Sequence, residues 1–126
     1  MEDSILITTK KILGIDASYT QFDLDIITHI NAAFTTLNDL GVGDELGFMI
    51  MSDEETWQDF TMDLLQQNAA KTYLFLRVKL AFDPPQTSFH INSLQEQVKE
   101  LEVRMNTRRE NVAWQPPAPS SSPSLP

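Results

Sequence analysis

The chain has 126 residues, contains no cysteine and carries a formal net charge of −9. This length predicts one domain, and the absence of cysteine excludes disulfides and thiolate metal sites. The negative charge argues against sequence-specific binding to duplex DNA, because it repels the phosphate backbone. The acidic start does not resemble a signal peptide, and no apolar run is long enough to span a membrane. We therefore expect a protein that is made and kept in a cytosol-like compartment.

The charge is distributed unevenly along the chain. Residues 1–63 contain 13 acidic residues and two lysines, a net charge of −11, whereas residues 64–126 carry a net charge of +2. Acidic loops that keep a domain soluble would explain this asymmetry. Opposite ends of the molecule that face different partners would explain it equally well. Both interpretations remain open from the sequence.

Two helices are predicted at the start of the chain. The first is capped by Asp3 or Ser4 and stops before Gly14. The second begins at a predicted capping box formed by Thr20 and Asp23, and it ends at Gly41. At 100° per residue its apolar side chains share one face, which predicts a core-facing helix. These side chains are Phe22, Ile26, Ile27, Ile30, Ala33, Phe34, Leu37 and Leu40.

Residues 41–61 form a long acidic loop that is punctuated by glycines. A connection of this length inside a small domain is usually functional or mobile. Its apolar centre could be a short strand or an extended arm, and we expect it to contact a neighbouring molecule. That centre consists of Phe48, Met49, Ile50 and Met51. Trp57 and Phe60 are expected to return the chain to the core.

A third long helix is predicted from about Met62 to Phe82, although alternation within residues 74–80 also permits a strand. Between residues 73 and 82 the apolar side chains surround the helix axis, so the helix needs cover on every side. In so small a protein we expect neighbouring copies to supply part of that cover. The expected subunit contacts are Tyr73, Phe75, Arg77 and Lys79, with the two cations pairing to acids of the adjacent copy.

The dipeptide Pro84-Pro85 predicts a break, followed by a last helix over residues 86–110. Its apolar residues form a seam as narrow as that of a coiled coil, which predicts a projecting helix with surface available for contact. These residues are Ile91, Leu94, Val98, Leu101 and Met105. The Pro/Ser-rich tail, residues 111–126, cannot build a core. The predicted architecture is an all-α bundle of about four to five helices, with a core over residues 1–85.

No pattern in the sequence predicts an enzyme, a cofactor or a metal site. His29 and His90 have no ligand partner at helical spacing, so structural roles are favoured. The acids at 53–55 lack the spacing of a calcium loop. A hydrolase site hidden within residues 53–63 stays open as an alternative. A helix-turn-helix is disfavoured, because the second helix carries no Lys or Arg with which to contact DNA.

Six segments together resemble the head–tail connector family of tailed bacteriophages, also called adaptor or head-completion proteins. The most specific segment is residues 70–85, AKTYLFLRVKLAFDPP. The others are residues 7–15 (ITTKKILGI), 22–27 (FDLDII) with 30–31 (IN), 37–43 (LNDLGVG), 57–60 (WQDF) and 101–106 (LEVRMN).

The resemblance implies a structural protein of the virion neck, present in the host cytoplasm during assembly. It implies a homo-oligomeric ring, usually of about a dozen copies, beneath the portal protein. Such a ring would extend the DNA channel, bind a stopper or tail protein and let DNA pass without specific binding.

Within this family role, the last helix and the tail are expected to contact the portal. The expected portal contacts are Phe89, Arg104, Arg108, Arg109 and Trp114. The loop residues 48–51 are expected to face the next neck component or a neighbouring subunit. The alternative function is an acidic DNA-mimic inhibitor or another small helical interaction module.

Overall fold

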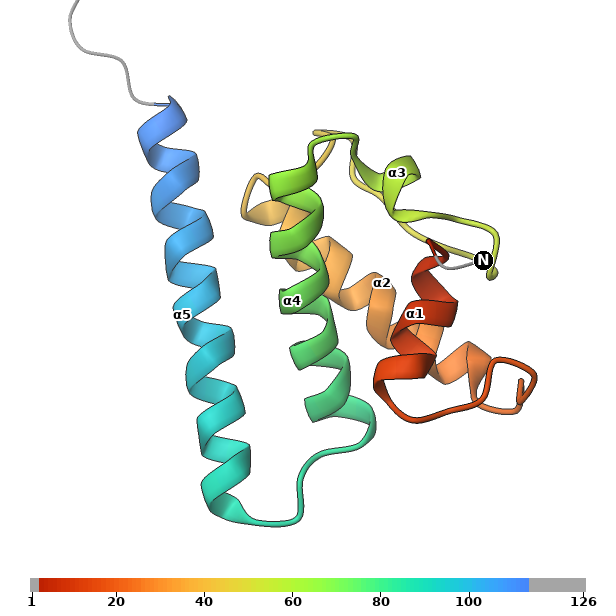
Figure 1. The fold of residues 1–126 in the computed structure, drawn as a ribbon. Helices are drawn as coiled ribbons and strands as arrows, with labels where there is room; N and C mark the ends of the chain where they lie inside the picture. The colour runs from red at the N-terminus through yellow and green to blue at the C-terminus, as the bar shows by residue number, and fades with distance from the viewer. Residues whose placement is uncertain (1–2, 114–126) are drawn as a thin grey trace, which may run out of the picture.

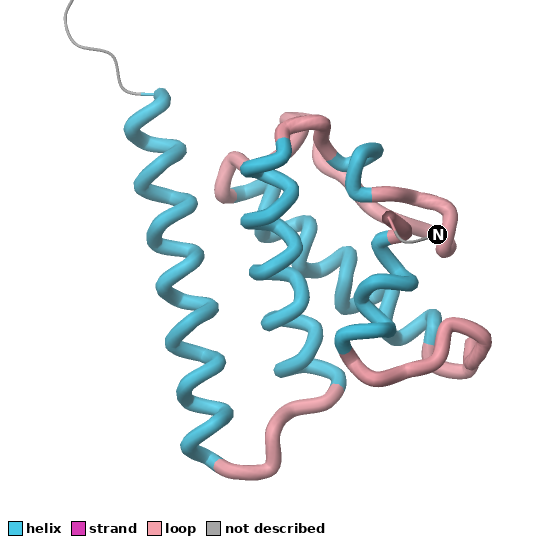
Figure 2. Tube along the Cα trace, viewed as in Figure 1, coloured by secondary structure: helices cyan, strands magenta, loops and turns pink. Residues whose placement is uncertain are grey.

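The computed structural model describes residues 3–113, and side chains as far as residue 107. Within that part the chain forms five helices and no strand, so the predicted all-α class is confirmed (Figures 1 and 2). The helices are α1 (Ile5–Ile12), α2 (Asp23–Asp39), α3 (Trp57–Phe60), α4 (Leu64–Phe82) and α5 (Ser88–Ala113). Residues 111–113, which were assigned to the tail, end α5.

Helix α1 begins as predicted. The Ser4 hydroxyl accepts a hydrogen bond from the Ile7 amide and donates one of 2.7 Å to the Asp53 carbonyl. Ser4 also forms an isolated antiparallel bridge with Thr56, so the start of the chain holds the end of the α2–α3 loop. Gly14 follows the helix with a φ of +79°, a conformation that glycine adopts without the Cβ penalty.

The predicted capping box at the start of α2 is wrong. Phe22 occupies the N-cap position, and no side chain caps the helix there. The Asp23 carboxylate instead lies 2.8 Å from the ammonium of Lys10, which is buried and also donates to the carbonyls of Ala17 and Tyr19. A buried cation without an anion is costly, so pairing with Lys10 outweighs capping.

The core-facing side of α2 is confirmed for five buried side chains: Ile26, Ile30, Ala33, Phe34 and Leu37. Phe22, which was assigned to the same face, precedes the helix and is exposed. Helix α2 packs on α4, which also contacts α1, α3 and α5. In Figure 1, α4 lies between α5 on one side and α1 and α2 on the other. The capping carboxylate of Asp63 starts α4 by accepting from the amides of Leu65 and Gln66.

The apolar centre of α4 is covered by its own chain. Tyr73, Leu74 and Val78 are buried, and the remaining large apolar side chains of residues 73–82 are half-buried against the core. The helix prediction is confirmed and the strand alternative is wrong. The expectation that neighbouring copies supply part of the cover stays a prediction, although α4 contacts the four other helices of its own chain.

Helix α5 lies antiparallel to α4 instead of projecting from the core (Figure 1). The proline break is confirmed, since α4 ends at Phe82 and α5 begins at Ser88. The seam predicted on α5 packs on α4, and Val98 and Met105 join the hydrophobic core. With 26 residues against 19, α5 is longer than α4 by about 10 Å at 1.5 Å per residue. It therefore extends beyond its partner.

Candidate functional site

A polar cluster fastens the centre of the α4–α5 pair. The Tyr73 hydroxyl donates a hydrogen bond of 2.6 Å to the Glu102 carboxylate and accepts one from the Arg77 guanidinium. Arg77 also lies 3.8 Å from Glu102. Burial, reinforced by the hydrogen bond to Glu102, raises the pKa of Tyr73 to about 12, although Arg77 acts in the opposite direction. The cluster ties the two helices together at one defined register.

The four residues predicted as subunit contacts all contact other residues of their own chain. Tyr73 is buried, and the Phe75 ring stands perpendicular to the Trp57 ring at 6.0 Å between centroids. Arg77 is paired with Glu102, and Lys79 lies 3.0 Å from the Asp83 carboxylate. The two cations have acids of their own chain, so no acid of a neighbouring copy is required to neutralise them.

The Asn31 side chain holds the α2–α3 loop against α2 by forming hydrogen bonds with the backbone of the loop. The Asn31 amide donates to the Ile50 carbonyl at 2.9 Å, and the Asn31 oxygen accepts from the Ile50 amide at 2.8 Å. Ile50 is consequently buried, and Phe48 packs between the rings of Phe34 and Phe60. The centre of the loop is neither a strand nor a free arm.

Only part of the predicted loop contact is accessible. Ile50 and Phe48 face inward, whereas Met49 and Met51 are exposed. The turn beyond them is folded around Glu55, whose carboxylate accepts from the amides of Met51 and Ser52. Burial alone would raise the pKa of Glu55, but these hydrogen bonds, with those of its own amide and of the Ser52 hydroxyl, lower it below its usual value. The carboxylate is therefore part of the loop structure.

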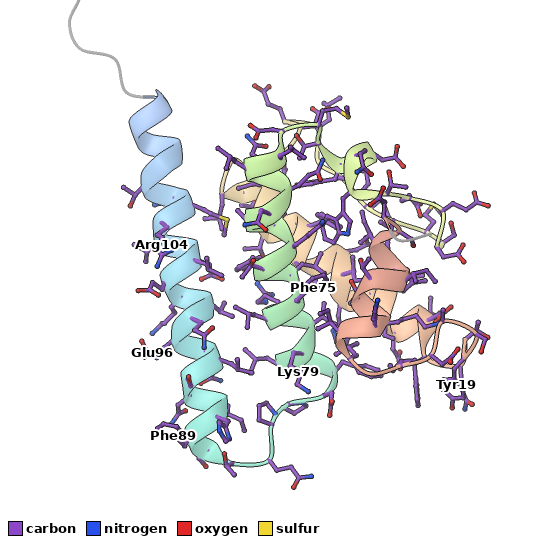
Figure 3. The ribbon with its side chains drawn as sticks, viewed as in Figure 1. Tyr19, Phe75, Lys79, Phe89, Glu96 and Arg104 are labelled. Atoms are coloured by element: carbon purple, nitrogen blue, oxygen red, sulfur yellow. The ribbon has the colours of Figure 1, made fainter. Side chains whose placement is uncertain are left out.

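The predicted portal contacts are not brought together. Phe89 and Arg104 both lie on the side of α5 that faces away from α4, but they are four turns apart (Figure 3). Arg104 is exposed and lies 3.4 Å from Glu100. Arg108 and Arg109 belong to α5, but their side chains lie outside the described residues, as does Trp114 as a whole.

Sequence reasoning missed an apolar surface at the beginning of α4. Three large side chains are mostly exposed there: Met62 (77%), Leu64 (74%) and Leu65 (67%). We call these three residues the end surface. The Gly43 amide donates to the Gln66 side chain, which holds the loop beside the first turn of α4. Because α4 and α5 are antiparallel, the end surface and the last turns of α5 lie at the same end of the molecule (Figure 1).

No group of three or more His, Asp or Glu side chains in the described region could hold a metal ion. None of the helices in the same region is long and apolar enough to cross a membrane. The Thr87 hydroxyl contacts His90 at 2.8 Å, which gives this histidine a local structural partner. The accessible groups are instead gathered in apolar and charged surfaces.

These surfaces define a small all-α interaction protein. A family model for phage connector proteins matches residues 5–112, and the chain belongs to that family. No curated protein and no solved structure matches it. The membership confirms the resemblance seen in the sequence. It assigns the chain a structural role in connecting the head and tail of a phage, and the family implies a location in the virion.

Proposed function

We propose that the chain is a neck adaptor that docks on the portal protein through the last turns of α5 and carries the stopper or tail protein. The observation that carries this proposal is the position of the basic end of α5. Arg104 is exposed on the face turned away from α4 (Figure 3), and Arg108 and Arg109 follow it in the same helix. Arginine side chains on a helix surface can pair with acids of a partner protein.

Several copies would form a ring that extends the DNA channel. Head-to-tail contacts between two different faces of one chain close into rings. The exposed Met49 and Met51 of the α2–α3 loop supply one face that could contact a neighbouring subunit or the next neck component. Methionine side chains adapt to irregular partner surfaces, so they suit such a contact.

The charge of the chain fits passage of DNA without specific binding. Residues 39–63 contain eight acidic residues and neither Lys nor Arg. A wall of this sign would repel phosphates and so avoid holding the DNA. A DNA mimic would need carboxylates in a regular array, but Glu55, Asp59 and Asp63 here accept hydrogen bonds from backbone amides of their own loop and helices. The connector role is therefore the better supported of the two.

Charge reversal at the end of α5 tests the proposed portal contact. Deleting residues 86–126 would uncover the core, because Val98 and Met105 belong to it. We instead replace Arg104, Arg108 and Arg109 by Glu in the full chain and measure binding to the purified portal protein of the same phage. Weaker binding with an unchanged circular dichroism spectrum supports the proposal. Binding equal to that of the wild type contradicts it.

A further inference from the structure

A groove lies between α2 and the loop that follows it. It has a volume of about 390 Å³, which is within the range of ligand pockets. Its lining combines aromatic and aliphatic surface with side-chain amides, and none of the lining residues is charged: Asn31, Phe34, Thr35, Asn38, Leu46, Gly47, Phe48 and Met49. A charged occupant would lose water there without gaining an ion pair. The groove therefore favours an uncharged occupant.

One side-chain amide of the groove is free to bind an occupant. The Asn31 amide is already used by the backbone of Ile50, and the Thr35 hydroxyl donates to the Asn31 carbonyl at 3.0 Å. The Asn38 amide lies beside Gly47, since a Cβ on this glycine would be 3.7 Å from the Asn38 nitrogen. Among the described residues this amide has no hydrogen-bond partner. The groove thus offers an N–H donor next to aromatic surface.

The sequence that follows α5 matches this surface. Residues 114–126 lie outside the described residues, but their sequence contains five prolines and no charged residue. Proline has a carbonyl acceptor and no N–H donor, so a site for a proline-rich segment must supply the donors itself. Aromatic-lined grooves bind such segments, because their extended conformation is restricted before binding. An uncharged groove with a free amide donor meets these requirements.

The groove is within reach of residues 114–126. Helix α2 packs on α4, and α4 packs on α5. Packed helix axes are 8–10 Å apart, so the axes of α2 and α5 are separated by about 20 Å at most where the helices pack. In Figure 1 the C-terminal end of α2 lies toward the last turns of α5. The thirteen residues after Ala113 can span about 43 Å at 3.3 Å per residue, which is more than the required distance.

We propose that this groove binds residues 116–121 of its own chain, which we call the tail segment. A segment tethered by a short linker is present at a millimolar effective concentration. A proline-rich segment of another protein, or of a second copy, would have to compete with it. The bound tail segment would also cover Leu46, which is 94% exposed in the described part of the chain. The tether therefore selects the occupant.

The absence of cysteine permits a direct test by disulfide formation in the full chain. The Leu46→Cys/Ser121→Cys variant places one thiol on the groove and the other in the tail segment. The matched control is Met62→Cys/Ser121→Cys. Met62 is also exposed and lies at the start of α4, where the Gly43–Gln66 hydrogen bond holds the loop, but it does not line the groove. Oxidation should form the intramolecular disulfide about tenfold faster in the groove pair than in the control pair, because binding raises the local thiol concentration.

A second test places a charge in the tail segment. Ala118→Asp would bring a carboxylate into the uncharged groove, so the segment should be released. NMR spectra of the full chain should then show shifted resonances for the Asn38 side-chain amide. The exposed Asn68 side-chain amide on α4 should not change. Ser124→Asp, which adds the same charge outside the tail segment, is the matched control and should leave both amides unchanged.

Faster disulfide formation in the groove pair, together with the Asn38 shift, supports the inference. Equal rates in the two cysteine pairs would overturn it, and so would an Asn38 amide that Ala118→Asp leaves unchanged. Disulfides that form between molecules, at a rate that rises with protein concentration, would also overturn it, because the occupant would then be the tail of a second copy. None of these results depends on binding to the portal, so the proposed function is tested separately.

Discussion

The Tyr73 hydroxyl and the Glu102 carboxylate, 2.6 Å apart, join α4 to α5 across 29 residues of sequence. Arg77 completes the cluster by donating to the same hydroxyl. Because α5 belongs to the core only through a narrow seam, this polar cluster contributes to holding its register on α4. A surface at the end of α5 is then presented in a fixed position.

Removing the Tyr73 hydroxyl should destabilise the protein. We expect Tyr73→Phe to lower the free energy of unfolding by about 1.5–3 kcal/mol, the range for a hydrogen bond to a charged group. Urea denaturation measures this difference. Tyr19→Phe is the control, because the Tyr19 hydroxyl contacts Gln21 at an exposed position. An equal effect of the two changes would contradict a special role for the Tyr73–Glu102 bond.

The same residue should make the protein sensitive to alkaline pH. The folded-state pKa of Tyr73 is about 12, whereas the reference value is 10.0. Between these values the unfolded chain loses the Tyr73 proton and the folded chain keeps it, so stability decreases as pH rises. We expect thermal melts between pH 9 and about 12 to show a smaller decrease for Tyr73→Phe than for the wild type. Melting temperatures that fall in parallel for the two proteins would contradict the raised pKa of Tyr73.

Lys10 should be essential for the connection between α1 and α2. Lys10→Met leaves the Asp23 carboxylate and the carbonyls of Ala17 and Tyr19 without their donor. Breaking a buried ion pair costs about 3–5 kcal/mol, and the partial exposure of Asp23 places our expectation near the lower end, at about 3 kcal/mol. Lys11→Met, at the exposed neighbouring position, should change stability by less than about 0.5 kcal/mol. Equal shifts of the denaturant midpoint in Lys10→Met and Lys11→Met would contradict this difference between the two lysines.

Two glycines with positive φ should respond differently to the same substitution. A Cβ on Gly43 would lie 2.6 Å from the Phe60 ring, whereas a Cβ on Gly14 would meet nothing within 4 Å. Gly14→Ala should therefore lower the free energy of unfolding by only about 1–2 kcal/mol, the cost of placing a Cβ in a left-handed backbone conformation. Gly43→Ala should lower the free energy of unfolding by about 1–3 kcal/mol more than that. The added Cβ would overpack the Phe60 ring, which is buried among other rings. Equal melting temperatures for the two variants would show that Phe60 moves freely.

The helices could be predicted from the sequence because their signals are local. The apolar face of α2, the end of α4 before Pro84 and the serine cap of α1 all depend on neighbouring residues. The capping box at Thr20 failed because Asp23 is used by Lys10, which is 13 positions earlier in the sequence. A capping motif depends only on neighbouring residues, so it gives no information about a tertiary contact such as the Lys10–Asp23 ion pair.

The cover of α4 and the state of the loop could not be predicted, because both depend on contacts between distant segments. Asn31 holds Ile50 across 19 residues, and a lone asparagine in a helix gives no sign of that partner. The exposure of Leu64 and Leu65 was equally hidden, since apolar residues at the start of a helix ordinarily predict burial. Their position outside the face that contains Ala70 and Tyr73 was the available signal.

Hydrogen–deuterium exchange on the full chain, alone and bound to the purified portal, tests the central claim most directly. The account predicts new protection in the last turns of α5. It also predicts little change in residues 73–82, because α4 already contacts the four other helices in the free chain. Protection that is concentrated in residues 73–82, with the end of α5 unchanged, would contradict it.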